Sequence, residues 1–280
     1  MLFNLILLLS ALFAAGVCFA AGGFSSFGWL WLLPVGFVGG FLICLLLCFL
    51  AVWIPSISVD PEKQQEDDDP YARAVVKLYA PAVFRLLGCK IETSGTEKLP
   101  KEGRFLLVCN HTSNFDPGIP LAVFPDAQLA FIAKKEVQDM PIVGRLMRKI
   151  LCQFVDREND RAALKTILRC ISILKEDKAS IGVFPEGGII KDGKLLHHFR
   201  PGVFKIAQKA KVPIVVCTVR NTNQVFRNAK KLKPTDVHLH LLKVIQPEEF
   251  ADITAVELGN RIHTMMAEDL GPDLVLKENP

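Results

Sequence analysis

The first 59 residues contain no Asp, Glu, Lys, Arg or His, so every charged side chain lies in the rest of this 280-residue chain. Two apolar stretches fill the charge-free region, residues 2–23 and 29–53. As helices, both are long enough to cross a hydrocarbon core of about 30 Å. Only the five residues Phe24–Gly28 separate them. We therefore expect a helical hairpin that returns the chain to its starting side, either by spanning the bilayer twice or by entering and leaving one leaflet.

Two other interpretations of the apolar start are a cleaved signal peptide and a shallow interfacial anchor. A signal peptide begins with positive charge, and the first segment has none. Trp29, Trp31 and Trp53 stand near the ends of the second segment, where indole rings prefer to sit in a bilayer. Membrane helices are therefore favoured, and a uniformly soluble protein is excluded.

The charges that follow are unevenly distributed. Residues 60–69 hold six acids and one lysine, which leaves 32 basic and 23 acidic residues from Pro70 onward, a net charge of +9. A basic body beside a membrane suits an anionic lipid surface or a phosphorylated substrate. A nucleic-acid partner is not expected, because there is neither a dense basic stripe nor a recognition motif.

These patterns divide the chain into a membrane-anchoring hairpin (1–54), an acidic linker (55–70) and one folded domain (71–280). The domain opens with apolar residues at helical spacing over 71–87, where Pro81 predicts a kink. Short apolar runs then alternate with helical patterns, which is typical of an α/β domain with a largely parallel central sheet flanked by helices. The expected strands are 105–109, 129–133, 180–184 and 213–219, and the expected helices are 116–124, 161–175, 203–209 and 256–268.

Cysteine and histidine patterns do not indicate a metal centre. The eight cysteines form no CxxC pair, so we expect buried thiols in a reducing compartment rather than disulfides or zinc ligands. His238 and His240 alternate on an apolar strand and share one face, but no third ligand accompanies them, so a wetted strand face is favoured over a metal pair. The remaining candidates for surface histidines, in loops and on a helix, are His197, His198 and His263.

One motif places polar groups at the end of a buried strand. Residues 105–109 lead directly into Asn110 and His111, and Asp116 follows five residues after the histidine. Strand ends are where α/β folds carry reactive groups, and an imidazole oriented by a carboxylate is a general base. On a regular helix the two side chains would point about 140° apart, so they can meet only if residues 112–114 form a turn.

A second motif opens another apolar strand, 180–184, into Pro185, Glu186 and two glycines. Glycines after a strand let the backbone approach a phosphate, and Glu186 could bind a hydroxyl or orient a base. Taken alone, this motif is equally typical of a turn with a solvated glutamate.

Together the two motifs resemble the paired signatures of the glycerolipid acyltransferases, most of all the 1-acylglycerol-3-phosphate (lysophosphatidic acid) acyltransferases. Asn110-His111 with Asp116 matches the first signature, and Phe184-Pro185-Glu186-Gly187, whose glutamate lies 75 residues after His111, matches the second. The resemblance covers roughly residues 75–245. Further matches stand in the family's order at Phe131–Val137, Pro141, Gly144, Val155–Arg157, Phe199–Gly202 and Val212–Val215.

The resemblance implies a direct acyl transfer. His111 would take the proton from the free glycerol hydroxyl of lysophosphatidic acid while that oxygen attacks the thioester of an acyl-CoA or an acyl-carrier protein, and Asp116 would orient His111. The product would be phosphatidic acid, made in phospholipid synthesis at the cell membrane, with the catalytic domain on the cytoplasmic side. The implied partners are the thioester donor, the lysophospholipid acceptor and membrane lipids. No cofactor or metal ion is expected.

The chain departs from the family at one position. The second signature commonly continues Glu-Gly-Thr-Arg, whose arginine grips the acceptor's phosphate, whereas this chain has Ile189 at that place. Isoleucine cannot replace a guanidinium, so another cation must serve or the acceptor differs. The candidate cations are Lys134, Lys135, Lys191, Lys194 and Arg200. The residues expected to bind substrate are Asn110, Lys134, Lys135, Arg157, Glu186, Gly187, Gly188, Lys194 and Arg200.

Three alternatives to lysophosphatidic acid acylation stay open from the sequence. One is an acyltransferase or transacylase that uses another lysolipid or lipid alcohol, and another is a hydrolase on the same scaffold. The third is a non-catalytic lipid-binding membrane protein, which the isoleucine at position 189 makes conceivable and the intact Asn110, His111 and Asp116 oppose.

Overall fold

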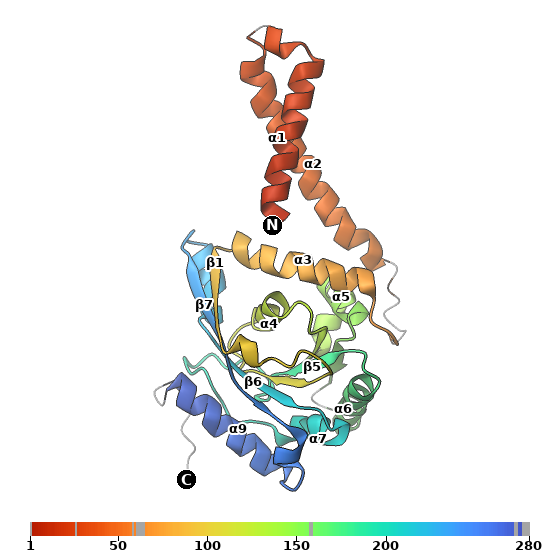
Figure 1. Cartoon of the computed structure of the whole chain (residues 1–280), viewed down its shortest axis with the longest axis vertical. Helices are drawn as coiled ribbons and strands as arrows, with labels where there is room; N and C mark the ends of the chain where they lie inside the picture. Colours follow the sequence, from red (N-terminus) through yellow and green to blue (C-terminus); the bar gives the residue numbers. More distant parts are fainter. Residues whose placement is uncertain are drawn as a thin grey trace. The chain divides into compact units, whose positions relative to one another are not determined.

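The computed structural model describes residues 2–25, 27–57, 59, 65–156, 159–271 and 274–275, and the chain forms two compact units, Met1–Asp60 and Pro61–Pro280. The first unit is a pair of helices, α1 (Leu2–Ala20) and α2 (Trp29–Ile57), which run antiparallel (Figure 1). They approach closely where residues are small, because a Cβ added at Gly36 would lie 3.0 Å from the Cα of Ala14.

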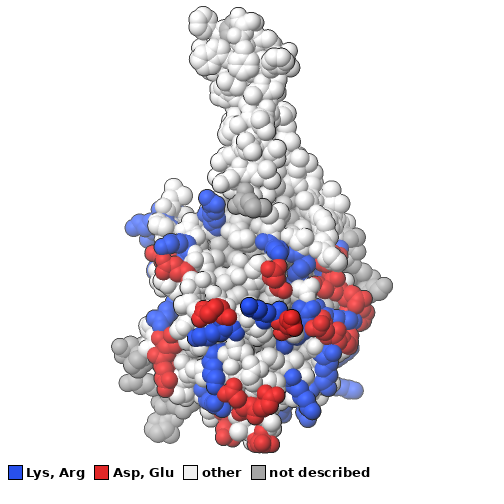
Figure 2. All heavy atoms as spheres, in the orientation of Figure 1, with Lys and Arg blue, Asp and Glu red and all other residues white. Residues whose placement is uncertain are grey.

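The surface of this helix pair is apolar. Within the most apolar windows of α1 and α2, whose mean hydropathies are 2.4 and 2.8, only 22% and 11% of residues are buried. Figure 2 shows no charged side chain on either helix. Both helices are long and apolar enough to cross a membrane, and the pair fits the hairpin predicted from the sequence, which indicates a membrane-associated protein.

Residues 65–69, inside the segment predicted as an acidic linker, belong to the second unit and pair with its side chains. Asp69 accepts a hydrogen bond from the backbone N–H of Ala72 and so caps helix α3 (Pro70–Leu86). Asp69 also pairs with Lys149 at 2.9 Å, and Asp68 pairs with Arg73 at 2.8 Å. The other end of the predicted linker belongs to α2, which continues to Ile57. Helix α3 runs through Pro81 without a break in the assigned helix.

The second unit is built on a seven-stranded sheet with the order β1-β7-β6-β2-β5-β3-β4. The five strands from β6 to β4 are parallel, β7 is antiparallel to β6, and β1 is parallel to β7. This confirms the predicted α/β fold with a largely parallel sheet. The strands are β1 (Cys89–Ser94), β2 (Leu106–Val108), β3 (Leu129–Lys134), β4 (Gln153–Val155), β5 (Ser180–Val183), β6 (Ile214–Arg220) and β7 (Thr235–Ile245).

Helices cover both faces of the sheet. Figure 1 shows α3, α4 and α5 on one side and α7 and α9 on the other. Every residue of β2 and β5 is buried, as expected for central parallel strands covered on both faces. The remaining helices are α4 (Gly118–Val123), α5 (Val143–Lys149), α6 (Asp160–Lys175), α7 (Lys205–Ala210), α8 (Val225–Ala229) and α9 (Ala255–Leu270).

Strand register sets the position of the site. Val108 at the end of β2 is level with Val183 of β5 and with Val216 of β6. Because these strands are parallel, the segments that follow them emerge at one edge of the sheet. The helix predicted over 116–124 begins later, at Gly118, because Asp116 belongs to the turn before it.

Candidate active site

The site begins where β2 ends. The backbone N–H of Cys109 donates to the carbonyl of Val183 at 3.2 Å, which extends the pairing with β5 by one residue. Asn110 and His111 follow at the edge of the sheet. The strand therefore delivers His111 from a rigid, buried part of the fold.

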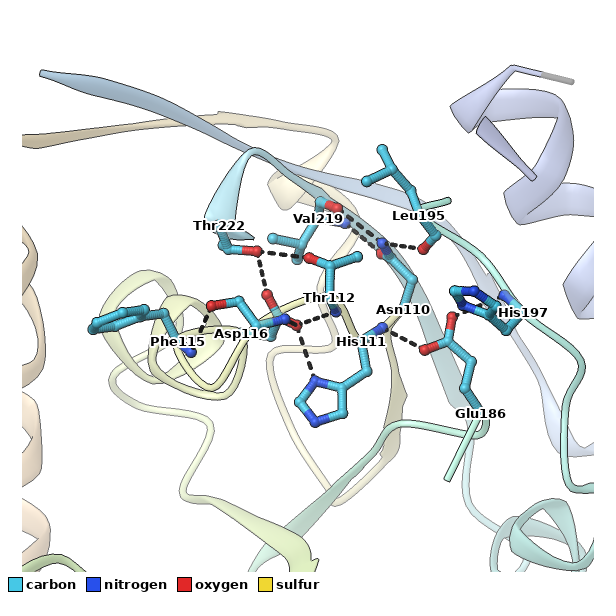
Figure 3. Close-up of polar contacts among 11 residues, drawn as sticks. Asn110, His111, Thr112, Phe115, Asp116, Glu186, Leu195, His197, Val219 and Thr222 are labelled. Atoms are coloured by element: carbon cyan, nitrogen blue, oxygen red, sulfur yellow. Dashed lines mark hydrogen bonds and ion pairs between the residues drawn. The ribbon is translucent and has the colours of Figure 1, made fainter. Parts of the chain in front are cut away.

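A tight turn brings Asp116 back to His111. One carboxylate oxygen, Oδ2, accepts hydrogen bonds from the backbone N–H groups of Thr112 (2.6 Å) and Ser113 (2.7 Å) and from Nδ1 of His111 (2.9 Å). The other oxygen, Oδ1, accepts from the hydroxyl of Thr222, which follows β6. Asp116 is fully buried, and both of its oxygens are engaged (Figure 3). The turn predicted from residues 112–114 thus closes around the carboxylate.

His111 is fixed on two sides. An ionised carboxylate only accepts hydrogen bonds, so Nδ1 of His111 donates to Asp116 and Nε2 retains its lone pair. The imidazole stacks on the ring of Phe184, with centroids 4.3 Å apart and planes 20° apart. Its side chain is 15% exposed, and in Figure 3 the second ring nitrogen points away from Asp116 with no contact drawn to it. Such an imidazole can accept a proton from a hydroxyl placed beside Nε2.

Asn110 holds the backbone around the site. Its amide nitrogen donates to the carbonyl oxygens of Leu195 (3.0 Å) and Val219 (2.9 Å), and its carbonyl oxygen accepts from the backbone N–H of Val219 (2.7 Å). The side chain is fully buried. The structure therefore places Asn110, which the sequence analysis assigned to substrate binding, as a tie between β2, β6 and the loop after β5.

Glu186 lies on the other side of the His111 backbone. Its Oε2 accepts from the N–H of His111 at 2.7 Å, and its Oε1 accepts from the N–H of His197 at 3.3 Å. Burial raises the pKa of Glu186 to about 8, against the lowering effect of these two hydrogen bonds. The carboxyl group therefore holds the backbone of His111 in position rather than lying in solvent.

His197 corrects one expectation from the sequence. It was expected in a surface loop, but it is 2% exposed, and its Nε2 contacts both carboxylate oxygens of Asp192 at 3.0 and 3.1 Å. The backbone N–H of His197 donates to Oε1 of Glu186, so the loop that carries His197 returns to the residues that follow β5. Neither this second histidine–aspartate pair nor Thr222 was identified from the sequence. Thr222 lies just after a predicted strand, and this position at a strand end is the sequence signal that could have indicated it.

The candidate cations differ in their surroundings. Lys134 pairs with Glu136 at 2.7 Å, and Lys135 pairs with Asp156 at 3.1 Å. Both lysines are exposed at the end of β3, two strands from β2 or about 10 Å away. Lys191 and Lys194 lie in the loop after β5, with Lys191 exposed. Arg157 lies outside the described residues.

Arg200 is a candidate cation that contacts the second motif, residues 184–187. Its backbone N–H donates to the carbonyl of Pro185 at 2.7 Å, and its side chain lies over Gly187. A Cβ added at Gly187 would come within 2.7 Å of Nε of Arg200, and Gly187 has a φ of +76°, so both space and backbone conformation require glycine there. Gly188 follows in the same turn. Among the described residues, no acceptor lies within hydrogen-bond distance of the Arg200 guanidinium.

His238 and His240 have separate carboxylate neighbours. His238 lies 3.3 Å from Glu92, and His240 lies 2.8 Å from Asp269. Both side chains are about half-exposed, as predicted for a wetted strand face. Among the described residues, no group of three or more His, Cys, Asp or Glu side chains could hold a metal ion.

Comparison with known proteins relates the domain that carries this site to acyltransferases. A family model described as "Acyltransferase" matches residues 90–220. A probable 1-acyl-sn-glycerol-3-phosphate acyltransferase of Mycoplasma genitalium is 28% identical over 80% of this chain and 86% of its own length. The 1-acyl-sn-glycerol-3-phosphate acyltransferase of Saccharomyces cerevisiae is 27% identical over 62% of this chain and 56% of its own length.

A solved structure agrees with these sequence matches. The crystal structure of the 1-acyl-sn-glycerophosphate (LPA) acyltransferase PlsC from Thermotoga maritima aligns with a TM-score of 0.59 and 25% identity. The alignment covers 81% of this chain and 95% of that one. The matched family region includes the strands that carry His111, Asp116 and Glu186. Residues 90–220 therefore match the acyltransferase family, and the relatives that align with this region are named as 1-acyl-sn-glycerol-3-phosphate acyltransferases.

Proposed function

We propose that this chain acylates the free glycerol hydroxyl of lysophosphatidic acid and releases phosphatidic acid, using a fatty acyl thioester as donor. The observation that carries the proposal is the geometry of His111, whose Nδ1 is held by the buried Asp116 and whose Nε2 is left to accept a proton. The relatives that match over most of the domain are acyltransferases named for this acceptor.

The reaction needs one base and no cofactor. Nε2 of His111 removes the proton from the acceptor hydroxyl as the oxygen attacks the thioester carbonyl carbon. The carbon–sulfur bond then breaks, and the imidazolium returns the proton to the leaving thiolate. Asp116 stabilises the imidazolium between these steps, and general-base catalysis of this kind contributes about 10² to 10⁴ in rate.

Among the residues that the structure describes, none beside His111 is a good nucleophile for a covalent acyl-enzyme. A hydrogen bond with Cys217 and burial raise the pKa of the Cys109 thiol well above its ordinary value. The hydroxyl of Thr112 contacts Thr222 at 3.0 Å, and that of Ser113 accepts from the backbone N–H of Phe115 at 3.2 Å. Direct transfer to the acceptor is therefore the mechanism that this arrangement favours.

Arg200 is the cation best placed to bind the acceptor's phosphate. It lies over Gly187, the residue next to Glu186, and Glu186 contacts the backbone of His111. Lys134 and Lys135 already have carboxylate partners, whereas Arg200 has none among the described residues. An arginine can bind phosphate in a bidentate manner, which the isoleucine at position 189 cannot.

The donor and the location complete the proposal. The thioester donor would be acyl-CoA or acyl-carrier protein, and either would reach the active site from the cytoplasm. The protein would act at the cell membrane, with the catalytic domain on the cytoplasmic side. The apolar helices α1 and α2 support membrane association.

The test is a thioester assay on the purified full-length protein that follows thiol release and lipid product together. Thiol release that depends on lysophosphatidic acid, with phosphatidic acid formed, is the expected result. His111→Ala should lower kcat by at least about 10², whereas His198→Ala, at an exposed histidine of the loop after β5, should leave it unchanged. Near-normal turnover by His111→Ala would contradict the mechanism, and activity with another acceptor alone would contradict the substrate.

A further inference from the structure

Helix α8 and the loop after it expose large apolar side chains beside several cations. Phe226 is 58% exposed, and Leu232 is 96% exposed, the largest value among the described large apolar residues. The neighbouring cations are all exposed: Arg227, Lys230, Lys231 and Lys233. This composition is unusual for a surface that meets only water.

Leu232 is also in an unfavourable backbone conformation. Its φ is +51°, in the left-handed region, where glycine or asparagine normally ends a helix. Its N–H donates to the carbonyl of Ala229 at 3.0 Å, and the N–H of Lys233 donates to Asn228 at 3.0 Å, so the position does end α8. A leucine here gains nothing from burial within the body. Its presence is explained if something outside the body receives its side chain.

The charged residues within 225–235 are all basic. No acidic residue occurs between Val225 and Thr235, and no carboxylate of a described residue pairs with these four cations. The ammonium of Lys230 lies 4.3 Å from the ring centroid of Phe226, which keeps positive charge directly beside exposed apolar surface.

The end of α3 extends this surface. Leu86 is 78% exposed, and Arg85 is exposed beside it. The backbone N–H of Thr235 donates to the carbonyl of Gly88 at 3.1 Å, and β1 pairs with β7 from that point, so the end of α3 and the α8 loop are neighbours (Figure 1). We call these residues together the α8 surface: Arg85, Leu86, Phe226, Arg227, Lys230, Lys231, Leu232 and Lys233.

We propose that the α8 surface docks on an anionic phospholipid bilayer, with Leu232 and Phe226 entering the headgroup region and the cations contacting lipid phosphates. Single apolar side chains flanked by basic ones suit a lipid interface. The core of a protein interface, in contrast, is depleted in lysine. The contact would add selectivity for negative lipids to a protein whose apolar helices carry no charge.

The first test measures the depth of a spin label on Leu232→Cys in the full-length protein. Cys44, Cys48 and Cys89, the cysteines that are not buried, are replaced by alanine beforehand. In nanodiscs that contain phosphatidylglycerol, we expect the label to become accessible to oxygen and protected from an aqueous nickel complex. The same label on Val256→Cys, 55% exposed at the start of α9, should stay in water.

Charge reversal checks the electrostatic part of the contact. Lys230→Glu combined with Lys231→Glu should return the Leu232→Cys label to water, because each cation near an anionic surface favours binding by about fivefold. A label at position 232 that behaves like the one at 256 in phosphatidylglycerol nanodiscs would overturn the proposal, and would leave an acidic protein as the candidate partner.

Leu232→Gly separates docking from a structural role. Glycine tolerates a φ of +51°, so the midpoint of thermal unfolding in detergent should stay the same or rise. Backbone amides of residues 226–233 should at the same time exchange hydrogen faster in anionic nanodiscs than those of the unmodified chain. A lowered unfolding midpoint would show that Leu232 serves the fold, and unchanged exchange would show that it does not contact lipid; either result contradicts the proposal.

Discussion

The polar groups at the end of β2 and the cations around the same edge of the sheet are organised in opposite ways. Asp116 and Asn110 are fully buried, and each makes three or more hydrogen bonds to groups fixed by the backbone or by neighbouring strands. Arg200, the cation proposed to bind the acceptor's phosphate, is in contrast exposed, as are Lys134 and Lys135.

This difference in burial matches a difference in role between the groups that support the proposed base and the cations proposed to bind substrate. A general base must hold one geometry through the reaction, so its supporting groups are preorganised inside the fold. A phosphate carried by a flexible lipid can be met by long side chains that adjust when it arrives. Removing a group from the first region should therefore lower kcat, while removing a cation from the second should act mainly on KM.

The largest effect is expected for Asp116→Asn. The amide keeps the shape of the side chain but cannot stabilise the imidazolium of His111 as a carboxylate does, and it cannot accept all four hydrogen bonds that Asp116 receives. We expect kcat to fall by about 10² to 10⁴ with little change in KM. Steady-state kinetics with lysophosphatidic acid measure this.

A fold defect would imitate that loss, so the variant needs a structural control. Circular dichroism and the unfolding midpoint should show a folded protein. Asp126→Asn, at an exposed ion pair with Lys77, is the matched variant and should keep normal kcat. A reduction of kcat by less than threefold in a folded Asp116→Asn protein would mean that Asp116 does not support the base.

A smaller effect is expected for Arg200→Ala, and it should appear in KM. A hydrogen bond to a charged group contributes about 1.5–3 kcal/mol, which corresponds to roughly 10- to 100-fold in KM for lysophosphatidic acid. Turnover of a neutral monoacylglycerol, if the enzyme accepts it, should not change. Lys191→Ala, at another exposed cation of the loop after β5, serves as the matched control and should have little effect.

The Ile189→Arg change sharpens the same prediction. Introduced into Arg200→Ala, it supplies a guanidinium where related enzymes commonly carry one, and KM should recover. A normal KM for Arg200→Ala alone would assign phosphate binding to a different cation.

The sequence predicted the parts of this molecule that depend on local patterns. The apolar runs of β2 and β5 and the strand-end positions of His111 and Glu186 follow from hydrophobic periodicity, and the turn that lets Asp116 reach His111 follows from its short polar residues. Long-range partners were not predictable in the same way. Thr222 meets Asp116 across 106 positions of sequence, and this contact exists only because β6 lies beside β2.

The burial of polar and charged residues was the other property that the sequence did not predict. His197 stands in a polar stretch, yet it is buried because the loop folds back and its N–H meets Glu186. The sequence around Glu186 is equally typical of a solvated turn. In the folded chain its carboxyl group is buried and accepts hydrogen bonds from the backbone of His111 and His197. The acidic segment 65–69 is a similar case. It was predicted as a linker, but its acids form ion pairs with Arg73, Lys149 and Arg169 of the folded domain.

The smallest effect concerns Glu186, the one buried carboxyl of the site that receives only two hydrogen bonds. Burial raises its pKa to about 8 from an ordinary 4.5, so the folded chain holds a proton that the unfolded chain releases. The protonated Glu186 therefore stabilises the folded state fully below about pH 4.5, and this stabilisation is lost as the pH rises through about 8. Between pH 6 and 8 the loss is on the order of 2 kcal/mol.

Glu186→Gln does not titrate, so the unfolding midpoint of this variant should fall less over that range than that of the unmodified protein. Glu97→Gln, at an exposed glutamate, should keep the full pH dependence. Equal pH dependence in all three proteins would mean that Glu186 is ionised in the folded state, and its two backbone hydrogen bonds would then outweigh its burial.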